Sequence, residues 1–192
     1  MYKSIYLLRH GSTKDNELGI NGSQTDTPLS EKGLLQAKNA VTNLSKYNFD
    51  LIFVSQLTRT YQTIKPYLET LEKPPRVITE PLTIERNLGI FTNTLASQGL
   101  IGEDIVKSGL SKTEWKPKNG ESTLDVTERA KKFYQVLKEA PAYEILICGH
   151  QNFLRCLELL ILEREVNDEN FFSENPPRLD NGEIRKYTLK NN

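Results

Sequence analysis

Short apolar runs alternate along the chain with stretches in which apolar residues recur at every third or fourth position. Runs that are rich in Ile, Leu, Val and Tyr and end at glycine or polar residues are typical of buried strands. The expected strands cover residues 5–8, 50–54, 77–79, 144–148 and 184–189. Because strands and helices alternate, the pattern predicts an α/β fold with a doubly wound, mostly parallel sheet and helices on both faces.

Two helices are expected in the first half of the chain. Ser30 can cap the first one, because a serine hydroxyl accepts a free N–H of the first turn. The apolar residues at helical spacing after it are Leu34, Ala37, Val41 and Leu44. The second helix has an apolar face formed by Leu57, Tyr61, Ile64 and Leu68. Pro66 lies inside this pattern and is expected to kink or split the helix, since proline lacks a backbone N–H.

The second half of the chain contains a strong helix signal. Residues 122–125 have the pattern of a capping box, which opens an amphipathic helix. The apolar residues on its face are Val126, Ala130, Phe133 and Leu137. A last helix is expected at residues 152–162, after the strand at 144–148.

Two long segments lack this periodicity. Residues 11–28 form an expected polar loop, and residues 87–120 are Gly-rich and irregular, with weak helical stretches. We expect the second segment to form a small cap over a crevice of the sheet. Because no repeat, low-complexity tract or linker interrupts the chain, residues 1–192 are expected to form one domain.

Composition and charge narrow the classes of function. The 25 Lys and Arg residues balance the 25 Asp and Glu residues, so no basic field favours nucleic acid or an anionic membrane. Cys148 and Cys156 are too few for a disulfide framework and lack the spacing of a zinc site, which indicates a reduced, cytoplasmic protein. We expect neither a signal peptide nor a membrane-spanning segment. No pattern indicates an oligomeric state.

The chain has two histidines, His10 and His150, and each directly follows a predicted strand. Ligands of an open parallel sheet bind beyond the carboxyl ends of its strands. Two adjacent strands would therefore bring both imidazoles to one crevice. Arg9 adds a fixed cation beside the first histidine, and Gly11 is expected to leave the backbone free to approach a ligand closely.

Further charged residues are expected at the same edge of the sheet. Arg59 lies one turn into a helix after the second strand, where an anion is favoured. Glu85 follows the third strand, with Glu80 and Glu103 as alternative carboxylates. Arginine offers a fork of donors to phosphate oxygens, imidazole can attack phosphorus, and a carboxylic acid can protonate a leaving oxygen. This set is sufficient for phosphoryl transfer without a metal or another cofactor.

Five ordered blocks between residue 5 and about residue 160 carry a family resemblance. The first two are residues 8–11 with Thr13 and Asn16, and residues 26–33 with Gln36 and Ala37. The later ones are residues 55–60 with Gln62 and Thr63, then Leu82, Glu85 and Gly89, and then residues 120–122 with Gly149 and His150. Together these blocks resemble the histidine phosphatase superfamily, the phosphoglycerate mutase-like group.

The resemblance implies a role for each matching residue. His10 would be the nucleophile that forms a phosphohistidine, and Glu85 would protonate the leaving group and later activate water. The phosphate pocket would consist of Arg9, Arg59 and His150. The substrate-binding positions at this pocket would include Thr13, Asn16 and Gln151. The resemblance also implies a doubly wound sheet and chemistry without metal.

Three positions depart from the family pattern. Ser12 stands where Glu or Gln is common, and Gln151 stands where Gly is usual. A bulky side chain at position 151 can narrow or tune the pocket rim. Ile20 lies near a position often held by Arg, which removes a cation that could hold a substrate carboxylate or a second phosphate.

The sequence therefore predicts a phosphomonoesterase, a histidine acid-type phosphatase acting on a small phosphorylated metabolite. One alternative is a cofactor-dependent phosphoglycerate mutase, which would hold its substrate with a longer, basic insertion, whereas residues 87–102 contain no Lys or Arg. The other is a non-catalytic member that binds phosphorylated ligands, against which the complete set of site residues argues. Four lysines surround Trp115 in the sequence: Lys107, Lys112, Lys116 and Lys118. They are typical of a solvated surface, and the alternative is that they give the cap its substrate specificity.

Overall fold

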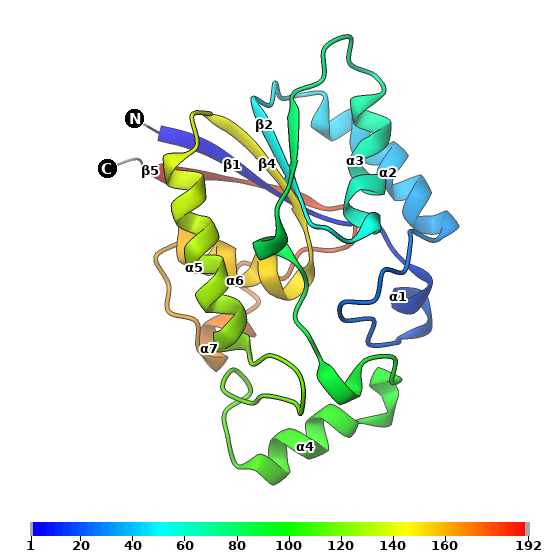
Figure 1. The fold of residues 1–192 in the computed structure, drawn as a ribbon, viewed down its shortest axis with the longest axis vertical. Helices are drawn as coiled ribbons and strands as arrows, with labels where there is room; N and C mark the ends of the chain where they lie inside the picture. Colours follow the sequence, from blue (N-terminus) through cyan, green and yellow to red (C-terminus); the bar gives the residue numbers. More distant parts are fainter. Residues whose placement is uncertain (1, 191–192) are drawn as a thin grey trace.

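A five-stranded sheet forms the centre of the computed structural model, which describes residues 2–190. The strands are β1 (Tyr2–Arg9), β2 (Leu51–Val54), β3 (Arg76–Thr79), β4 (Glu144–Gly149) and β5 (Ile184–Lys190). Their order is β3-β2-β4-β1-β5, and β5 pairs antiparallel with β1 while the other pairs are parallel (Figure 1). The expected mostly parallel sheet is confirmed, and each expected strand is present.

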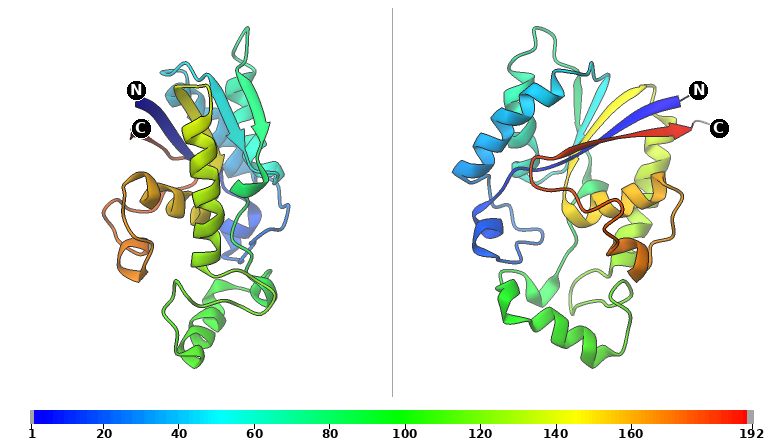
Figure 2. Two further views of the ribbon diagram at one scale, coloured as in Figure 1. Left: turned by 60° about the vertical axis from the view of Figure 1, so that its left-hand side comes forward. Right: turned by 180° about the vertical axis from the view of Figure 1, so that it is seen from behind.

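Two pairs of helices flank the sheet (Figure 2). The pair on one face is α2 (Glu31–Leu44) and α3 (Thr58–Leu68), and the pair on the other is α5 (Thr123–Glu139) and α6 (Gln151–Ile161). Because side chains alternate along a strand, β1 contributes to both cores. Ile5 and Leu7 pack with α5 and α6, whereas Tyr6 and Leu8 pack with α2 and α3.

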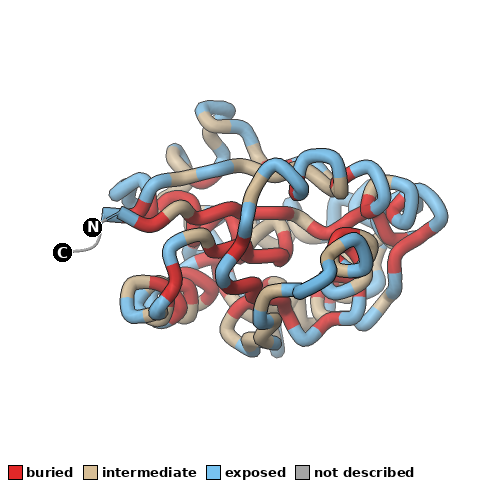
Figure 3. The backbone as a smooth tube through the Cα atoms, turned by 90° about the horizontal axis from the view of Figure 1, so that it is seen from above, coloured by how far each residue is buried: buried red, intermediate tan, exposed pale blue. Residues whose placement is uncertain are grey.

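The two cysteines lie in these two cores. The buried parts of the chain run through the middle of the molecule, with exposed segments outside them (Figure 3). Cys148 and Cys156 are buried free thiols, one in each core. Burial raises the pKa of the Cys156 thiol to about 12 and also raises that of Cys148, so both stay protonated at neutral pH. Within residues 2–190, every helix falls short of the length or apolar character that crossing a bilayer requires.

The caps of the long helices are where the sequence predicts them. Ser30 Oγ accepts the N–H of Gly33 at 3.2 Å at the start of α2. Ser122 Oγ accepts the N–H of Asp125 at 3.0 Å, and the Asp125 carboxylate accepts the N–H of Ser122 at 2.9 Å. These bonds satisfy backbone donors that the first turn leaves free. The predicted core residues of α5, from Val126 to Leu137, are fully buried.

Helices α2 and α3 differ from the expectation in the face that they bury. Leu34 and Tyr61 are 45% and 47% exposed. On α3 the buried face instead includes Arg59 and Thr63, because it turns toward the carboxyl ends of β1 and β4 and makes polar contacts there. Pro66 does not split the helix, since α3 runs without a break from Thr58 to Leu68. The helix ends at Leu68, so a proline in its last turn removes little of its hydrogen bonding.

The segment after β3 is more ordered than its composition indicates. It contains the 3₁₀ turns η1 (Pro81–Thr83), η2 (Gly89–Phe91) and η3 (Ala96–Gln98), followed by α4 (Leu100–Ser108). Helix α4 lies beyond the carboxyl ends of the strands (Figure 1). Trp115 anchors this region, since it is buried and its Nε1 donates to Asp104 Oδ2 at 2.9 Å. Two short helices were not expected, α1 (Lys14–Leu18) within the polar loop and α7 (Asp168–Phe171).

Candidate active site

The two histidines lie side by side at the carboxyl ends of β1 and β4. These strands are neighbours in parallel register, with Arg9 opposite Gly149. The residues that follow them, His10 and His150, therefore emerge at the same edge of the sheet. Their ring centroids are 5.1 Å apart, with 59° between the ring planes. The strand order therefore brings the two imidazoles together, as expected.

His10 is held as a neutral imidazole with its Nε2 unprotonated. Its Nδ1 lies 2.7 Å from the carbonyl oxygen of Gly11. A carbonyl oxygen only accepts hydrogen bonds, so Nδ1 carries the proton and Nε2 keeps its lone pair. Burial, together with the positive charges of Arg59 and Arg9, lowers the pKa of His10 to about 3. At neutral pH the lone pair of Nε2 is therefore available without prior proton removal.

His150 has the opposite tautomer. Arg59 Nε donates to its Nδ1 at 3.3 Å, so the proton of the neutral ring lies on Nε2. Burial, the neighbouring His10 and Arg59 keep the pKa of His150 well below its usual range. Its Nε2 is buried and has no hydrogen-bond partner within residues 2–190. A buried donor without a partner is costly, so an acceptor supplied by a ligand would be favoured here.

Two arginines supply fixed positive charge at the same place. Arg59 is buried and donates to the carbonyl oxygens of Thr25 at 2.5 Å and Ser23 at 3.0 Å, which fixes the plane of its guanidinium group. Arg9 donates from Nη1 to Leu179 O at 3.0 Å, whereas its buried Nε has no partner in the described part of the chain. Burial lowers the pKa of both groups and the Glu85 carboxylate opposes that shift, so both stay cationic.

A polar cavity of about 60 Å³ opens between these groups. The predicted site residues that line it are Arg9, His10, Thr13, Asn16, Arg59 and Glu85. Asp15, Gly22 and Ser23 also line it and were not predicted. His150 is not part of its lining; it is fully buried beside His10 and Arg59. We call this space the histidine cavity.

The side chain of Glu85, in the segment after β3, is held by the first turn of α6. Its Oε1 accepts the N–H of Arg86 at 2.7 Å, and its two oxygens lie 3.2 and 3.3 Å from the N–H of Asn152. Its backbone carbonyl is held by Gln24 Nε2 at 2.7 Å and Arg129 Nη2 at 3.2 Å. Arg129 also donates to Leu82 O at 2.7 Å and forms an ion pair with Glu121 at 3.0 Å. These contacts connect α5 and the loop after β1 to the backbone of Glu85.

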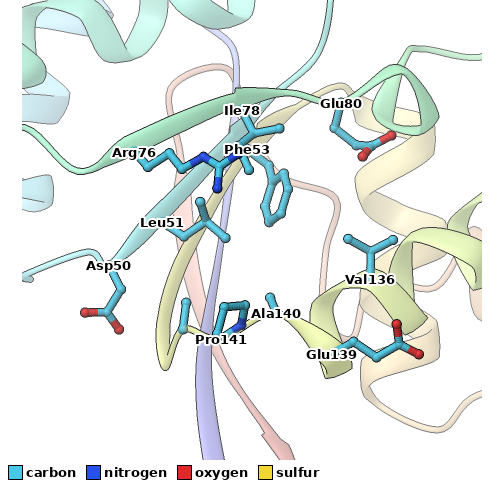
Figure 4. A pocket seen from close by; sticks show the side chains of 11 residues that line it. Asp50, Leu51, Phe53, Arg76, Ile78, Glu80, Val136, Glu139, Ala140 and Pro141 are labelled. Carbon is cyan, nitrogen blue, oxygen red and sulfur yellow. The ribbon is translucent and has the colours of Figure 1, made fainter.

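Neither alternative carboxylate reaches the histidines. Glu80 borders a different cavity of about 460 Å³ between β2, β3 and the end of α5 (Figure 4). Its Oε1 accepts the N–H of Leu82 at 3.0 Å and caps η1. Glu103 is exposed on α4, 3.7 Å from Lys107 Nζ. Of the three glutamates considered from sequence, Glu85 lines the histidine cavity.

Thr13 and Asn16 act together as the cap of α1. Thr13 Oγ1 accepts the N–H of Asn16 at 3.3 Å, and Asn16 Oδ1 accepts the N–H of Thr13 at 3.2 Å. Asn181, just before β5, donates to the carbonyl oxygen of His10 at 2.9 Å and lies 3.4 Å from Asn16 Oδ1. Asn181 could not be predicted from the sequence, because it is distant from His10 along the chain and lies in a polar loop.

Gly11, which follows His10, is required by the packing of the loop rather than by the approach of a ligand. A Cβ at Gly11 would lie 2.6 Å from the carbonyl oxygen of Gly33, and a Cβ at Gly33 would lie 2.0 Å from that of Ser12. Gly11 therefore allows the loop to pack against the first turn of α2, rather than against a ligand. Ser12 takes part in the same contact, since its N–H donates to Gln36 Oε1 at 2.7 Å.

Two further departures from the family pattern have clear positions. Gln151 is the first residue of α6 and does not line the histidine cavity; its Oε1 is buried without a partner among residues 2–190. Ile20 pairs with Leu95 in an isolated bridge, which ties the loop after α1 to the cap. Of the four cap lysines, Lys107 and Lys116 form exposed ion pairs with Glu103 and Asp125, as a solvated surface requires.

Comparisons with known proteins agree with this geometry. The model of the histidine phosphatase superfamily (branch 1) matches residues 5–189. The chain is 31% identical to the adenosylcobalamin/alpha-ribazole phosphatase of Escherichia coli (strain K12) over 157 residues, which cover 80% of this chain and 76% of that protein. It is 32% identical to a phosphoglycerate mutase of Schizosaccharomyces pombe over 183 residues, which cover 86% of this chain and 82% of the mutase.

A solved structure has the same fold. The crystal structure of the alpha-ribazole phosphatase from Shigella flexneri superposes with a TM-score of 0.82 at 26% identity, covering 95% of this chain and 89% of that chain. The match of the family model over nearly the whole chain and the identity to the curated relatives lead to one conclusion. This chain belongs to the histidine phosphatase superfamily (branch 1).

Proposed function

We propose that this chain is a phosphomonoesterase that hydrolyses a small phosphorylated metabolite through a phosphohistidine on His10. One observation carries the proposal. His10, with its unprotonated Nε2, lies in a buried site that holds two donors without a partner among residues 2–190, Arg9 Nε and His150 Nε2. The oxygens of a phosphoryl group would satisfy both donors while phosphorus faces the nucleophile. The similarity to curated phosphatases supports the same activity.

In the first half of the reaction, the lone pair of His10 Nε2 attacks phosphorus. The bond between phosphorus and the ester oxygen breaks, and the departing oxygen takes the proton of the Glu85 carboxyl group. Arg9, Arg59 and the Nε2–H of His150 bind the phosphoryl oxygens as negative charge shifts during transfer. The hydrogen bond from Nδ1 to Gly11 stabilises the positive charge that the imidazole gains.

In the second half, water attacks the phosphorus of phosphohistidine on the side that the alcohol has left. The Glu85 carboxylate takes one proton from this water, the bond between phosphorus and nitrogen breaks, and its electron pair returns to His10 Nε2. Inorganic phosphate leaves. Glu85 is protonated again and His10 is neutral, so the cycle is complete without a metal or another cofactor.

Hydrolysis is favoured over return of the phosphoryl group to the product. Phosphoglycerate keeps a carboxylate after it loses the phosphoryl group, and a mutase must hold that product while it reorients. Residues 87–102 contain no Lys or Arg. In the described part of the chain, the histidine cavity has Arg9 and Arg59 as its cations and Asp15 as an added negative charge. A second anionic group so close to His10 would lack a partner.

Replacement of the nucleophile tests the proposal. His10→Ala should lower turnover of p-nitrophenyl phosphate by roughly a thousandfold or more, because the remaining groups offer no covalent route. Thermal unfolding should show that the variant is folded, and Glu80→Gln, at the distant cavity, serves as the control. Substantial activity in His10→Ala would contradict the proposed role. A wild-type protein that binds phosphate but releases none from any phosphomonoester would instead be the non-catalytic alternative.

A further inference from the structure

A second cavity, of about 270 Å³, adjoins Glu85. Asn152 lines it and donates its backbone N–H to the Glu85 carboxylate, and Arg86, the next residue along the chain, lines it as well. We call it the side cavity. Its apolar lining residues are Leu88, Ile101, Ile105, Trp115, Phe171 and Phe172. They come from the cap and from the segment around α7, which are distant in sequence.

The position of Glu85 decides which part of a substrate can reach this space. In the proposed reaction, Glu85 protonates the ester oxygen, so the alcohol must lie next to its carboxyl group. The histidine cavity, at about 60 Å³, has room for little beyond the phosphoryl group. The side cavity lies next to it, because Asn152 and Leu88 of its lining contact Glu85 and Ser23 of the histidine cavity. Its volume is slightly below that of pockets for drug-sized ligands, about 300 Å³ and larger.

Arg178 supplies this cavity with a cation whose contacts within residues 2–190 are with aromatic rings. The centre of its guanidinium group lies 4.9 Å from the ring centroids of both Phe171 and Phe172. Its side chain forms no hydrogen bond or ion pair with any residue in the range 2–190. Arg86 differs, because it donates to Glu121 O, Thr123 Oγ1 and Trp115 O and is thereby satisfied.

Arg178 also borders a cavity lined by Glu174, Asp180 and Glu183, but the lining of the side cavity contains no carboxylate within residues 2–190 and favours an anion there. The guanidinium is half-buried, and burial together with the charge of Arg155 lowers its pKa. Lys112 adds a second positive charge at the same wall, with Nζ 5.1 Å from the centroid of Phe172. A cation that stacks on aromatic rings keeps its edge N–H groups free, and a carboxylate or phosphate can accept two of them at once.

We propose that the side cavity binds the alcohol part of the substrate and that Arg178 pairs with a second anionic group on that alcohol. This inference rests on the proposed phosphatase function. The substrate class is then a phosphomonoester whose alcohol has an apolar or aromatic body and also carries a carboxylate or a further phosphate. Phosphoglycerates have the second anion but lack the apolar body, so they should be poor substrates.

A pair of isosteric compounds tests the role of Arg178. 3-Carboxyphenyl phosphate and 3-carbamoylphenyl phosphate have the same shape, and only the first carries a second anion at neutral pH. Wild-type kcat/KM should be about tenfold higher for the carboxylate, the effect of one charge-assisted pair. In Arg178→Met the ratio should fall to about one, and Arg178→Lys should restore part of it. Arg76→Met, an arginine at the distant cavity, is the matched control and should keep the wild-type ratio (Figure 4).

The apolar walls make a separate prediction. Cyclohexylmethyl phosphate should have a higher kcat/KM than methyl phosphate, since both leaving groups are simple alkanols and only the first fills the cavity. Ile105→Asn should reduce this preference. Equal wild-type kcat/KM for the carboxylate and the amide would overturn the role of Arg178 even if no Arg178 variant folds. If none of these compounds is hydrolysed, the proposed function fails, and this inference fails with it.

Discussion

Glu85→Gln should separate acid catalysis from the structural role of this side chain. Glutamine keeps the size of the group and an acceptor oxygen, which can still take the N–H groups of Arg86 and Asn152. The second carboxylate oxygen becomes an NH₂ group, so the contact at 3.3 Å to Asn152 is lost. One long hydrogen bond of this kind contributes about 1 kcal/mol or less to the free energy of unfolding. The variant should therefore fold like the wild type.

The catalytic loss should be much larger and should depend on the leaving group. General acid catalysis contributes about 10²–10⁴-fold to a rate, and glutamine cannot transfer a proton. Alkyl phosphates, whose leaving oxygen needs the proton, should lose activity by roughly that factor in kcat/KM. p-Nitrophenyl phosphate has a good leaving group, so its loss in the transfer step should be less than about tenfold. Release of the alcohol and of p-nitrophenol at substrate concentrations well below KM measures the ratio, because kcat/KM then reports the transfer step and not the later hydrolysis of the shared phosphohistidine.

The matched control is Glu80→Gln, which changes a glutamate of the same chain that caps η1 away from the histidines. It should leave both substrates unaffected. Equal losses on alkyl and nitrophenyl substrates in Glu85→Gln would refute the reasoning, since a purely structural role would damage both reactions alike. Loss of the alkyl reaction in Glu80→Gln would move the acid to that residue.

The remaining predictions concern the histidines, metal and product. Because burial lowers the pKa of His10 from 6.5 to about 3 and also lowers that of His150, the unfolded chain binds more protons below pH 6.5. Stability should therefore fall as pH drops from 6.5 toward 3, by up to about 1.4 kcal/mol per pH unit for each histidine, and His150→Asn should flatten this fall in thermal unfolding. Excess chelator should leave turnover of p-nitrophenyl phosphate nearly unchanged, whereas a loss of turnover that magnesium restores would contradict metal-free chemistry. Orthovanadate should inhibit the enzyme, because it mimics the phosphoryl group during transfer. If 3-phosphoglycerate reacts at all with 2,3-bisphosphoglycerate, it should yield free phosphate and little 2-phosphoglycerate, and isomer interconversion faster than phosphate release would favour the mutase.

The sequence predicts the frame of the site because its signals are local. Apolar runs place the strands, and His10 and His150 stand at their ends, so neighbouring strands bring them together. The caps at Ser30 and Ser122 are equally local. The faces of α2 and α3 were predicted less well, since Tyr61 is exposed while Arg59 is buried by polar contacts that periodicity does not register.

The residues that support the site could not be predicted in this way. Arg129 holds the carbonyl of Glu85, and Asn181 holds that of His10, yet each is more than forty positions away along the chain. On base rates, a helical arginine or a loop asparagine is a solvated residue. Arg178 was missed for the same reason, because its relation to Glu85 depends on how the segment around α7 folds against the cap. Site residues at the ends of strands can be predicted from the sequence, whereas side chains that loop folding brings into contact cannot.

The most direct test of the account is to trap the covalent intermediate. Glu85→Gln slows the attack of water, so rapid denaturation in alkali during turnover of p-nitrophenyl phosphate should capture a phosphoryl group on the protein. Peptide mapping should place this acid-labile, base-stable phosphate on His10, with a stoichiometry that rises above the wild-type value. Phosphate on His150, or no phosphohistidine in either protein while p-nitrophenol is released, would contradict the central claim that His10 is the nucleophile.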